Sequence, residues 1–163
     1  MSREYIVAGK CVSAVRLGNQ SFKGYCSKIR MGRIDFALAS ETIKFGNIID
    51  LMLERSNINL NTLDVNPGIF QVMIYELYFG KNKKIKGGGA VKKELKKHID
   101  ILNQNLEILM KEKGISDRSK LISERAAEVS KMPTYIRVNT LKVNCKKGFD
   151  IIKESCSSAE LDQ

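Results

Sequence analysis

A segment near the middle of the sequence combines lysines and glycines that are suited to binding an anion. Between Lys81 and His98 there are eight lysines and one glutamate, a local charge of +7 in a chain of net charge +10. Backbone N–H groups of the triglycine Gly87–Gly89 could approach a phosphate closely, because no side chain blocks them just before a helix. Lysines add counterion release but no bidentate base readout. The segment therefore predicts phosphate contact with little base specificity.

The predicted RNA-binding residues are those of this segment and one arginine farther along. They are Lys81, Lys83, Lys84, Lys86, Gly87, Gly88, Gly89, Lys92, Lys93, Lys96, Lys97 and Arg137. Two other interpretations stay open, namely a solvated lysine face of an ordinary helix and contact with an anionic membrane surface. The triglycine is neither a Walker loop nor a convincing dinucleotide fingerprint, because no strand precedes it and no Gly-Lys-Ser/Thr follows it.

Cysteine and histidine are too sparse for a metal site or a nucleophile with a base. The cysteines are Cys11, Cys26, Cys145 and Cys156, none in a Cys-x-x-Cys pair, and the single histidine is His98. A structural zinc site needs four such ligands at characteristic spacings. We expect no metal, reduced thiols, and a partly buried structural role for His98 at the edge of an apolar stripe.

Composition indicates one globular domain, or one small domain with a fragment of another. The chain has 163 residues, of which 43% are hydrophobic, 28% charged and 7% aromatic, and it has no tryptophan. These values favour an aliphatic, mostly helical core. The uncharged run 65–75 is shorter than the roughly 20 residues of a membrane span, and the N-terminus has no secretory signal. The positive charge favours a polyanionic partner.

Apolar residues at helical spacing predict a mainly α fold. We expect a helix over 3–17, followed by a short polar connection through Gly24. Over 31–56 we expect either one helix kinked at Gly46 or two packed helices. Asn66 and Pro67 are suited to begin a helix, and Gly80 to end it in a left-handed conformation. The residues between them are apolar on nearly all sides, which predicts the central helix of a bundle.

The remaining pattern predicts a long helix, a connector and the start of another domain. The long helix runs from about residue 90 to 113 and ends at Gly114, and a weaker helix covers 118–130. Alternating β-formers predict a strand over 134–140, followed by a helix over 146–154. Because no second strand is available to pair with it, the sheet is expected to be incomplete. The predicted division is a helical RNA-binding bundle at 1–115, a linker helix at 116–132, and a truncated β–α start of the next domain at 133–163.

Three segments of the sequence are similar to a known family. The run Ile74–Lys81 with the basic glycine loop after it, and the run Pro133–Lys142, resemble the Sun family of RNA (cytosine-5) methyltransferases. Ser21–Gly24 fits the member that acts on large-subunit (25S/28S) ribosomal RNA. The resemblance implies a NusB-like helical region before a methyltransferase domain, S-adenosylmethionine as the cofactor of the whole enzyme, ribosomal RNA as the partner, and the nucleolus as the location.

No catalytic residue is carried over from the resemblance. The family's cysteines stand in Pro-Cys and Thr-Cys contexts, whereas the four cysteines here follow Lys10, Tyr25, Asn144 and Ser155. The sequence therefore predicts the N-terminal RNA-binding portion of a ribosomal RNA (cytosine-5) methyltransferase that ends before the catalytic domain, binds no cofactor itself and is inactive alone. The alternative is a stand-alone helical module that recruits RNA or a protein and has no enzymatic role.

Overall fold

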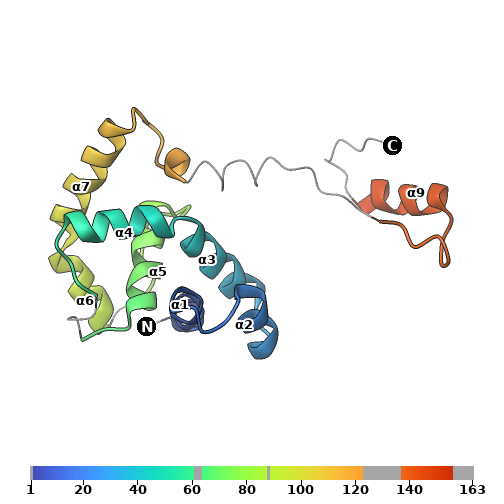
Figure 1. Cartoon of the computed structure of the whole chain (residues 1–163), viewed down its shortest axis with the longest axis horizontal. Coiled ribbons are helices and arrows are strands. Elements are labelled where there is room, and N and C mark those ends of the chain that lie inside the picture. Colours follow the sequence, from blue (N-terminus) through green and yellow to red (C-terminus); the bar gives the residue numbers. More distant parts are fainter. Residues whose placement is uncertain (1, 61–63, 88, 123–136, 156–163) are drawn as a thin grey trace. The chain divides into compact units, whose positions relative to one another are not determined.

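The computed structural model describes residues 2–60, 64–87, 89–122 and 137–155. The chain forms two compact units, 1–130 and 131–163, which are described separately here. The described part of each unit is helical (Figure 1), so the predicted mainly α class is confirmed. The NusB-like arrangement stays a prediction.

Four helices make up the N-terminal part of the first unit. They are α1 (Arg3–Arg16), α2 (Phe22–Ile29), α3 (Arg33–Lys44) and α4 (Gly46–Arg55). α1, α3 and α4 agree with the predicted helices. The interruption predicted at Gly46 lies one residue earlier, because Phe45 separates α3 from α4 and Gly46 begins α4.

The polar connection predicted through Gly24 is wrong, because this segment is helix α2. The Ser21 hydroxyl accepts a hydrogen bond from the Gly24 N–H at 3.1 Å, which satisfies an N–H group of the first turn. Cys26 is buried on the inner side of the helix. A good N-cap and a buried side chain thus outweigh the low helix propensity of glycine in this short helix.

Helix α5 (Pro67–Tyr78) lies at the centre of the first unit, as predicted. The Asn66 side-chain oxygen accepts the Ile69 N–H at 3.0 Å, which confirms the predicted cap. α5 packs against α1, α3, α4 and α6 (Figure 1). Phe70 and Ile74 are fully buried. A helix that is apolar on nearly all sides is covered on nearly all sides.

Gly80 follows α5 without the predicted left-handed conformation. The described glycines with positive φ are Gly18, Gly87, Gly89 and Gly114. A Cβ on Gly80 would lie 2.5 Å from the carbonyl oxygen of Glu76. Glycine is required there because the chain passes close to the end of its own helix.

Helices α1 and α5 approach each other closely through glycines. A Cβ on Gly68 would lie 2.1 Å from the Gly9 carbonyl oxygen, and a Cβ on Gly9 would lie 2.4 Å from Ile69 Cγ1. The Gly68 N–H donates to the Ser13 hydroxyl at 3.1 Å across the same contact. Backbone therefore packs directly against backbone here.

The long helix predicted from 90 to 113 is two helices, α6 (Ala90–Lys97) and α7 (Ile99–Glu112). His98 separates them with φ −106° and ψ 1°, and its N–H bonds to the Leu95 carbonyl in a tighter turn. Its half-buried ring lies with Nε2 3.4 Å from Glu94 Oε1, which agrees with the predicted structural role. Gly114, at φ 61°, ends α7 as predicted.

The first unit ends, within its described residues, in a single 3-10 turn, η1 (Arg118–Leu121). Asp117 begins it by accepting the Ser119 N–H at 3.0 Å. The helix predicted over 118–130 is therefore only a 3-10 turn in its described part, and residues 123–130 lie outside the described residues.

In the second unit, α9 (Cys145–Ser155) confirms the predicted helix over 146–154. The predicted strand over 134–140 is not formed in its described part, since 137–139 have no regular structure and 140–142 form a turn. The Asn139 side-chain oxygen accepts the Leu141 N–H at 3.1 Å, and its carbonyl accepts the Lys142 N–H. Asparagine turns the chain in this way. Residues 134–136 of the expected strand lie outside the described residues.

Prediction for the α1–α5 contact: Gly9→Ala should lower the free energy of unfolding by about 1–3 kcal/mol, because the added methyl group overpacks against Ile69. Gly46→Ala is the matched control, since its Cβ would meet only the Arg16 guanidinium at 3.5 Å or more. Urea denaturation followed by circular dichroism measures both. Equal stability of Gly9→Ala and the wild type would contradict the close contact.

Prediction for the core: Ile74→Asp should unfold the first unit, because a charge would be buried without a partner. Ile108→Asp changes a side chain that is 45% exposed and should leave the fold intact. Far-ultraviolet circular dichroism and thermal melting compare the two. A soluble Ile74→Asp protein as stable as the Ile108→Asp protein would show that α5 is not central.

Candidate nucleic-acid interface

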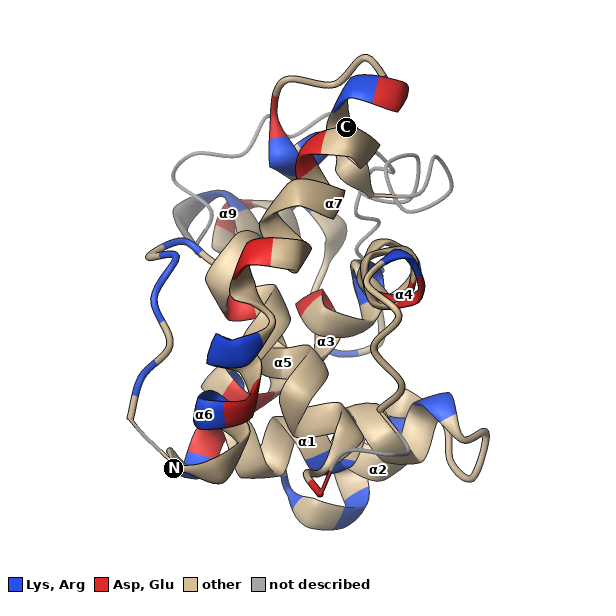
Figure 2. Cartoon of the chain, turned by 90° about the vertical axis from the view of Figure 1, so that its left-hand side faces the viewer, with Lys and Arg blue, Asp and Glu red and all other residues tan. Residues whose placement is uncertain are grey.

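The loop between α5 and α6, residues 81–89, is called the lysine loop below. Its side chains Lys81, Lys83, Lys84 and Lys86 are all exposed. Figure 2 shows their positive charge running along a loop at one side of the unit and continuing into α6. The structure thus brings the predicted loop lysines onto one surface.

Buried or half-buried side chains hold the lysine loop at two points. The Lys86 N–H donates to the Tyr5 hydroxyl at 2.9 Å, and Tyr5 is only 2% exposed. The Lys92 ammonium donates to the carbonyl oxygens of Ile85 at 3.2 Å and Gly87 at 2.7 Å. The loop is therefore attached to α1 at one residue and to α6 at two others.

Lys92 differs from the other lysines of the predicted surface. Its side chain is half-buried, and its ammonium group is directed at loop carbonyls. The arrangement suits it to position the loop rather than to meet a ligand first. Its sequence neighbours give no signal for this role, which depends on the curvature of the loop.

The backbone of the lysine loop turns at residues with positive φ. These are Lys83 at 47°, Gly87 at 70° and Gly89 at 122°. Gly89 also caps α6, and its carbonyl accepts the Lys93 N–H. Gly88 lies outside the described residues, so the predicted binding of an anion by the triglycine N–H groups stays a prediction.

Three of the four lysines of α6 lie away from its buried side. Val91 and Leu95 are buried, whereas Lys93, Lys96 and Lys97 are exposed. Lys97 forms an ion pair with Glu94 at 2.7 Å. This exposed pair contributes little to stability, and a polyanion can compete for the ammonium group.

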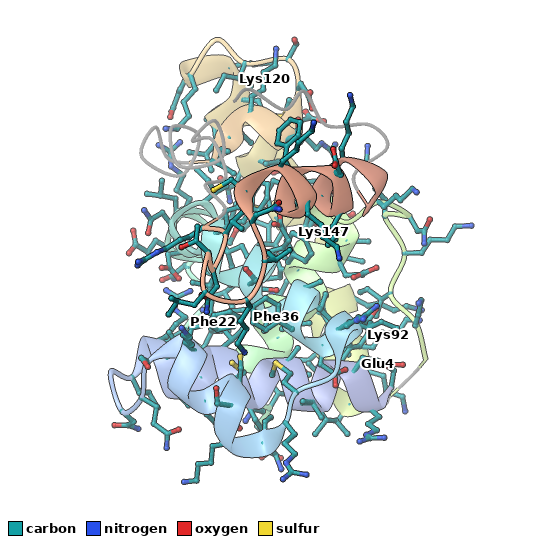
Figure 3. The ribbon with its side chains drawn as sticks, turned by 90° about the vertical axis from the view of Figure 1, so that its right-hand side faces the viewer. Glu4, Phe22, Phe36, Lys92, Lys120 and Lys147 are labelled. Carbon is teal, nitrogen blue, oxygen red and sulfur yellow. The ribbon has the colours of Figure 1, made fainter. Side chains whose placement is uncertain are left out.

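Carboxylates offset part of the charge of the loop. Burial raises the pKa of Glu76, and nearby Lys86 opposes that shift. The Ser2 hydroxyl lowers the pKa of Glu4, with a weaker contribution from Lys86. Figure 3 shows Glu4 and Lys92 labelled on the same side of the molecule. Both carboxylates thus lie close enough to Lys86 to feel its charge.

Arg137 is the one predicted RNA-binding residue that belongs to the second unit. It is exposed and precedes the turn at Asn139. Its predicted role in RNA binding stays a prediction.

The described residues show no arrangement that fits a metal or S-adenosylmethionine. No group of three or more His, Cys, Asp or Glu side chains among them could hold a metal ion. The glycines of the lysine loop follow a helix, whereas a nucleotide-type cofactor loop follows a strand.

The cysteines in the described part of the chain are free thiols. Cys11 and Cys26 are buried and Cys145 is exposed, while Cys156 lies outside the described residues. Burial raises the pKa of Cys11 to about 12, with a further contribution from Cys26. Cys11 is therefore a protonated core side chain at neutral pH and not a nucleophile.

Among the described residues, no helix is both long enough and apolar enough to cross a membrane.

Sequence reasoning misses a second basic surface. Between Glu4 and Asp35 there are six basic residues and no acidic one. This positive charge does not appear in the net charge of the chain outside residues 81–98, because acidic residues in other segments cancel it. A local charge count would reveal this segment, which contains α2.

Prediction for the loop anchor: Tyr5→Phe removes the acceptor of the Lys86 N–H. Loss of one such hydrogen bond costs about 1 kcal/mol, so amide exchange at Lys86 should become about fivefold faster. Tyr78→Phe is the control, because the Tyr78 hydroxyl donates to the Ile99 carbonyl elsewhere in the core. Hydrogen exchange followed by nuclear magnetic resonance gives the rates. Unchanged exchange at Lys86 in Tyr5→Phe would rule out this attachment.

Comparison with known proteins identifies the family. Residues 33–122, which include the lysine loop and α6, match the model of the NOL1/NOP2/Sun domain family member 5 N-terminal domain. The chain is 28% identical over 153 residues to the 28S rRNA (cytosine-C(5))-methyltransferase of Mus musculus, an alignment that covers 91% of this chain and 33% of that protein. No solved structure matches the chain.

Two further relatives carry related names. The 25S rRNA (cytosine-C(5))-methyltransferase NSUN5 of Arabidopsis thaliana is 31% identical over 117 residues, covering 71% of this chain and 20% of that protein. The 25S rRNA (cytosine-C(5))-methyltransferase rcm1 of Schizosaccharomyces pombe is 23% identical over 107 residues, covering 66% of this chain and 23% of that protein. The chain thus spans a third or less of the length of these relatives. It belongs to the family of the N-terminal domain of NOL1/NOP2/Sun domain family member 5, which confirms the resemblance seen in the sequence.

Proposed function

We propose that the chain is the RNA-contacting N-terminal portion of a ribosomal RNA (cytosine-5) methyltransferase. The observation that carries the proposal is an exposed lysine loop fixed by Tyr5 and Lys92 and continued by the lysines of α6. The names of the relatives, which are methyltransferases of 28S and 25S ribosomal RNA, support large-subunit ribosomal RNA as its ligand.

Attachment of the loop favours ligand binding over a merely solvated lysine face. Ordering a flexible loop on binding costs conformational entropy, and a loop already held in place avoids part of that cost. Lysines at fixed positions can neutralise several phosphates at once and release their counterions. Because lysine does not read base edges in a bidentate manner, the contact selects RNA by its backbone and shape.

In this proposal, methyl transfer belongs to a part of the protein that the described residues do not contain. The methyl donor of such an enzyme is S-adenosylmethionine, and the nucleolus is its site of action. Residues 1–115 form the RNA-binding bundle, 116–132 the linker, and 133–163 the start of the next domain. The bundle alone therefore binds RNA without methylating it.

Prediction for the interface: combined Lys→Glu substitution of Lys83, Lys84, Lys86 and Lys93 should abolish binding to a large-subunit ribosomal RNA fragment. The physical reason is loss of phosphate neutralisation together with new repulsion. Fluorescence anisotropy over a salt titration measures the affinity, and circular dichroism checks the fold.

The matched control makes the same charge change elsewhere, at Lys44, Lys111, Lys113 and Lys120. It should retain most of the affinity, since only long-range attraction is reduced and salt screens that part. Equal affinity of the loop variant and the wild type at every salt concentration would remove the hypothesis. Equal loss in both variants would show a non-specific effect of net charge.

A further inference from the structure

An exposed aromatic pair lies where α2 meets α3. The ring centroids of Phe22 and Phe36 are 4.9 Å apart with planes tilted by 50°. Phe36 is 45% exposed and Phe22 is half-buried. Figure 3 shows the two labelled residues next to each other. We call them the aromatic pair.

In the aromatic pair the Phe22 ring lies against the Phe36 ring, and nearly half of Phe36 remains exposed to water. Ile29, seven residues after Phe22 and thus on the same side of α2, is also 41% exposed. Clustered exposed apolar side chains of this kind mark binding surfaces more often than scattered ones do.

Basic residues lie near the aromatic pair in the sequence. Lys23 and Lys28 belong to α2, and Arg30 and Arg33 lie in and after the turn that follows it; all four are exposed. The sequence holds no acidic residue from 5 to 34. The nearest acidic residue in sequence, Asp35, lies in the first turn of α3, where a negative charge favours the helix N-terminus.

We propose that the aromatic pair stacks against a base of single-stranded RNA while these basic residues contact its phosphates. Exposed aromatic faces with neighbouring lysine and arginine are the recurring means of binding unpaired bases. An acidic protein segment would use the charge but has no need of an open ring face, so the combination favours RNA. The inference rests on the proposed function, because it adds a second contact to the same ligand.

Helix α1 connects this surface to the lysine loop. α2 packs against α1. The loop is bonded to Tyr5 near the beginning of the same helix. One strand of RNA contacting both surfaces would therefore lie along a rigid element. In this arrangement the lysine loop would bind the phosphates of the RNA, and the aromatic pair would bind only a strand that carries bases.

The test compares two ligands with the full chain. One is a single-stranded oligouridylate of about 16 nucleotides, and the other is an abasic sugar-phosphate oligomer of equal length. Phe36→Ala should lower the affinity for the oligouridylate about five- to a hundredfold and leave the affinity for the abasic oligomer unchanged. Phe36→Trp, which keeps an aromatic ring, should bind the oligouridylate about as tightly as the wild type. Ile108→Ala, an equally exposed apolar side chain on α7, should change neither.

Each other outcome has a definite meaning. Unchanged oligouridylate binding by Phe36→Ala would overturn the stacking site, and would leave the aromatic pair as a surface for a protein. Equal losses for both oligomers would also overturn it, since stacking requires a base. If the loop variant lost binding in the same experiment, the proposed function would stand without the stacking site. If the wild-type chain bound neither oligomer, both proposals would fail.

Discussion

The close approach of α1 and α5 at Gly9 and Gly68 is the constraint on which the bundle depends. A Cβ on either glycine would collide with the facing helix, so the two backbones meet directly. This contact places Tyr5, on α1, where its hydroxyl accepts the Lys86 N–H. The position of the charged surface loop therefore depends on a glycine contact in the core.

Sequence pattern predicts the elements whose local and global signals agree. Asn66 followed by Pro67 and an apolar run gives the central helix with its cap, and the structure shows both. The pattern of apolar residues gives the wrong helix boundaries where a local backbone turn or a capping side chain determines them. One apolar stripe continues through His98, yet the backbone turns there, and the Ser21 cap produces a helix in a segment that looks polar. Periodicity reports which side is buried and does not report where the axis changes direction.

Some features of the candidate site can likewise be predicted from the sequence, and others depend on the fold. The density of lysines and glycines in 81–97 is visible in the sequence, because local charge needs no knowledge of the fold. The different role of Lys92 depends on the carbonyls of Ile85 and Gly87 turning toward α6. The aromatic pair depends on two helices meeting at a tight turn, so no spacing rule within either helix predicts that Phe22 meets Phe36.

The 3-10 turn η1 closes the bundle by inserting Leu121, which is 1% exposed, into its core. The turn follows α7, at the end of the segment that the family model matches. A soluble fragment designed for crystallisation or spectroscopy should therefore retain residues through 122. Ending it at Gly114, where α7 stops, would uncover the apolar surface that Leu121 covers and promote self-association.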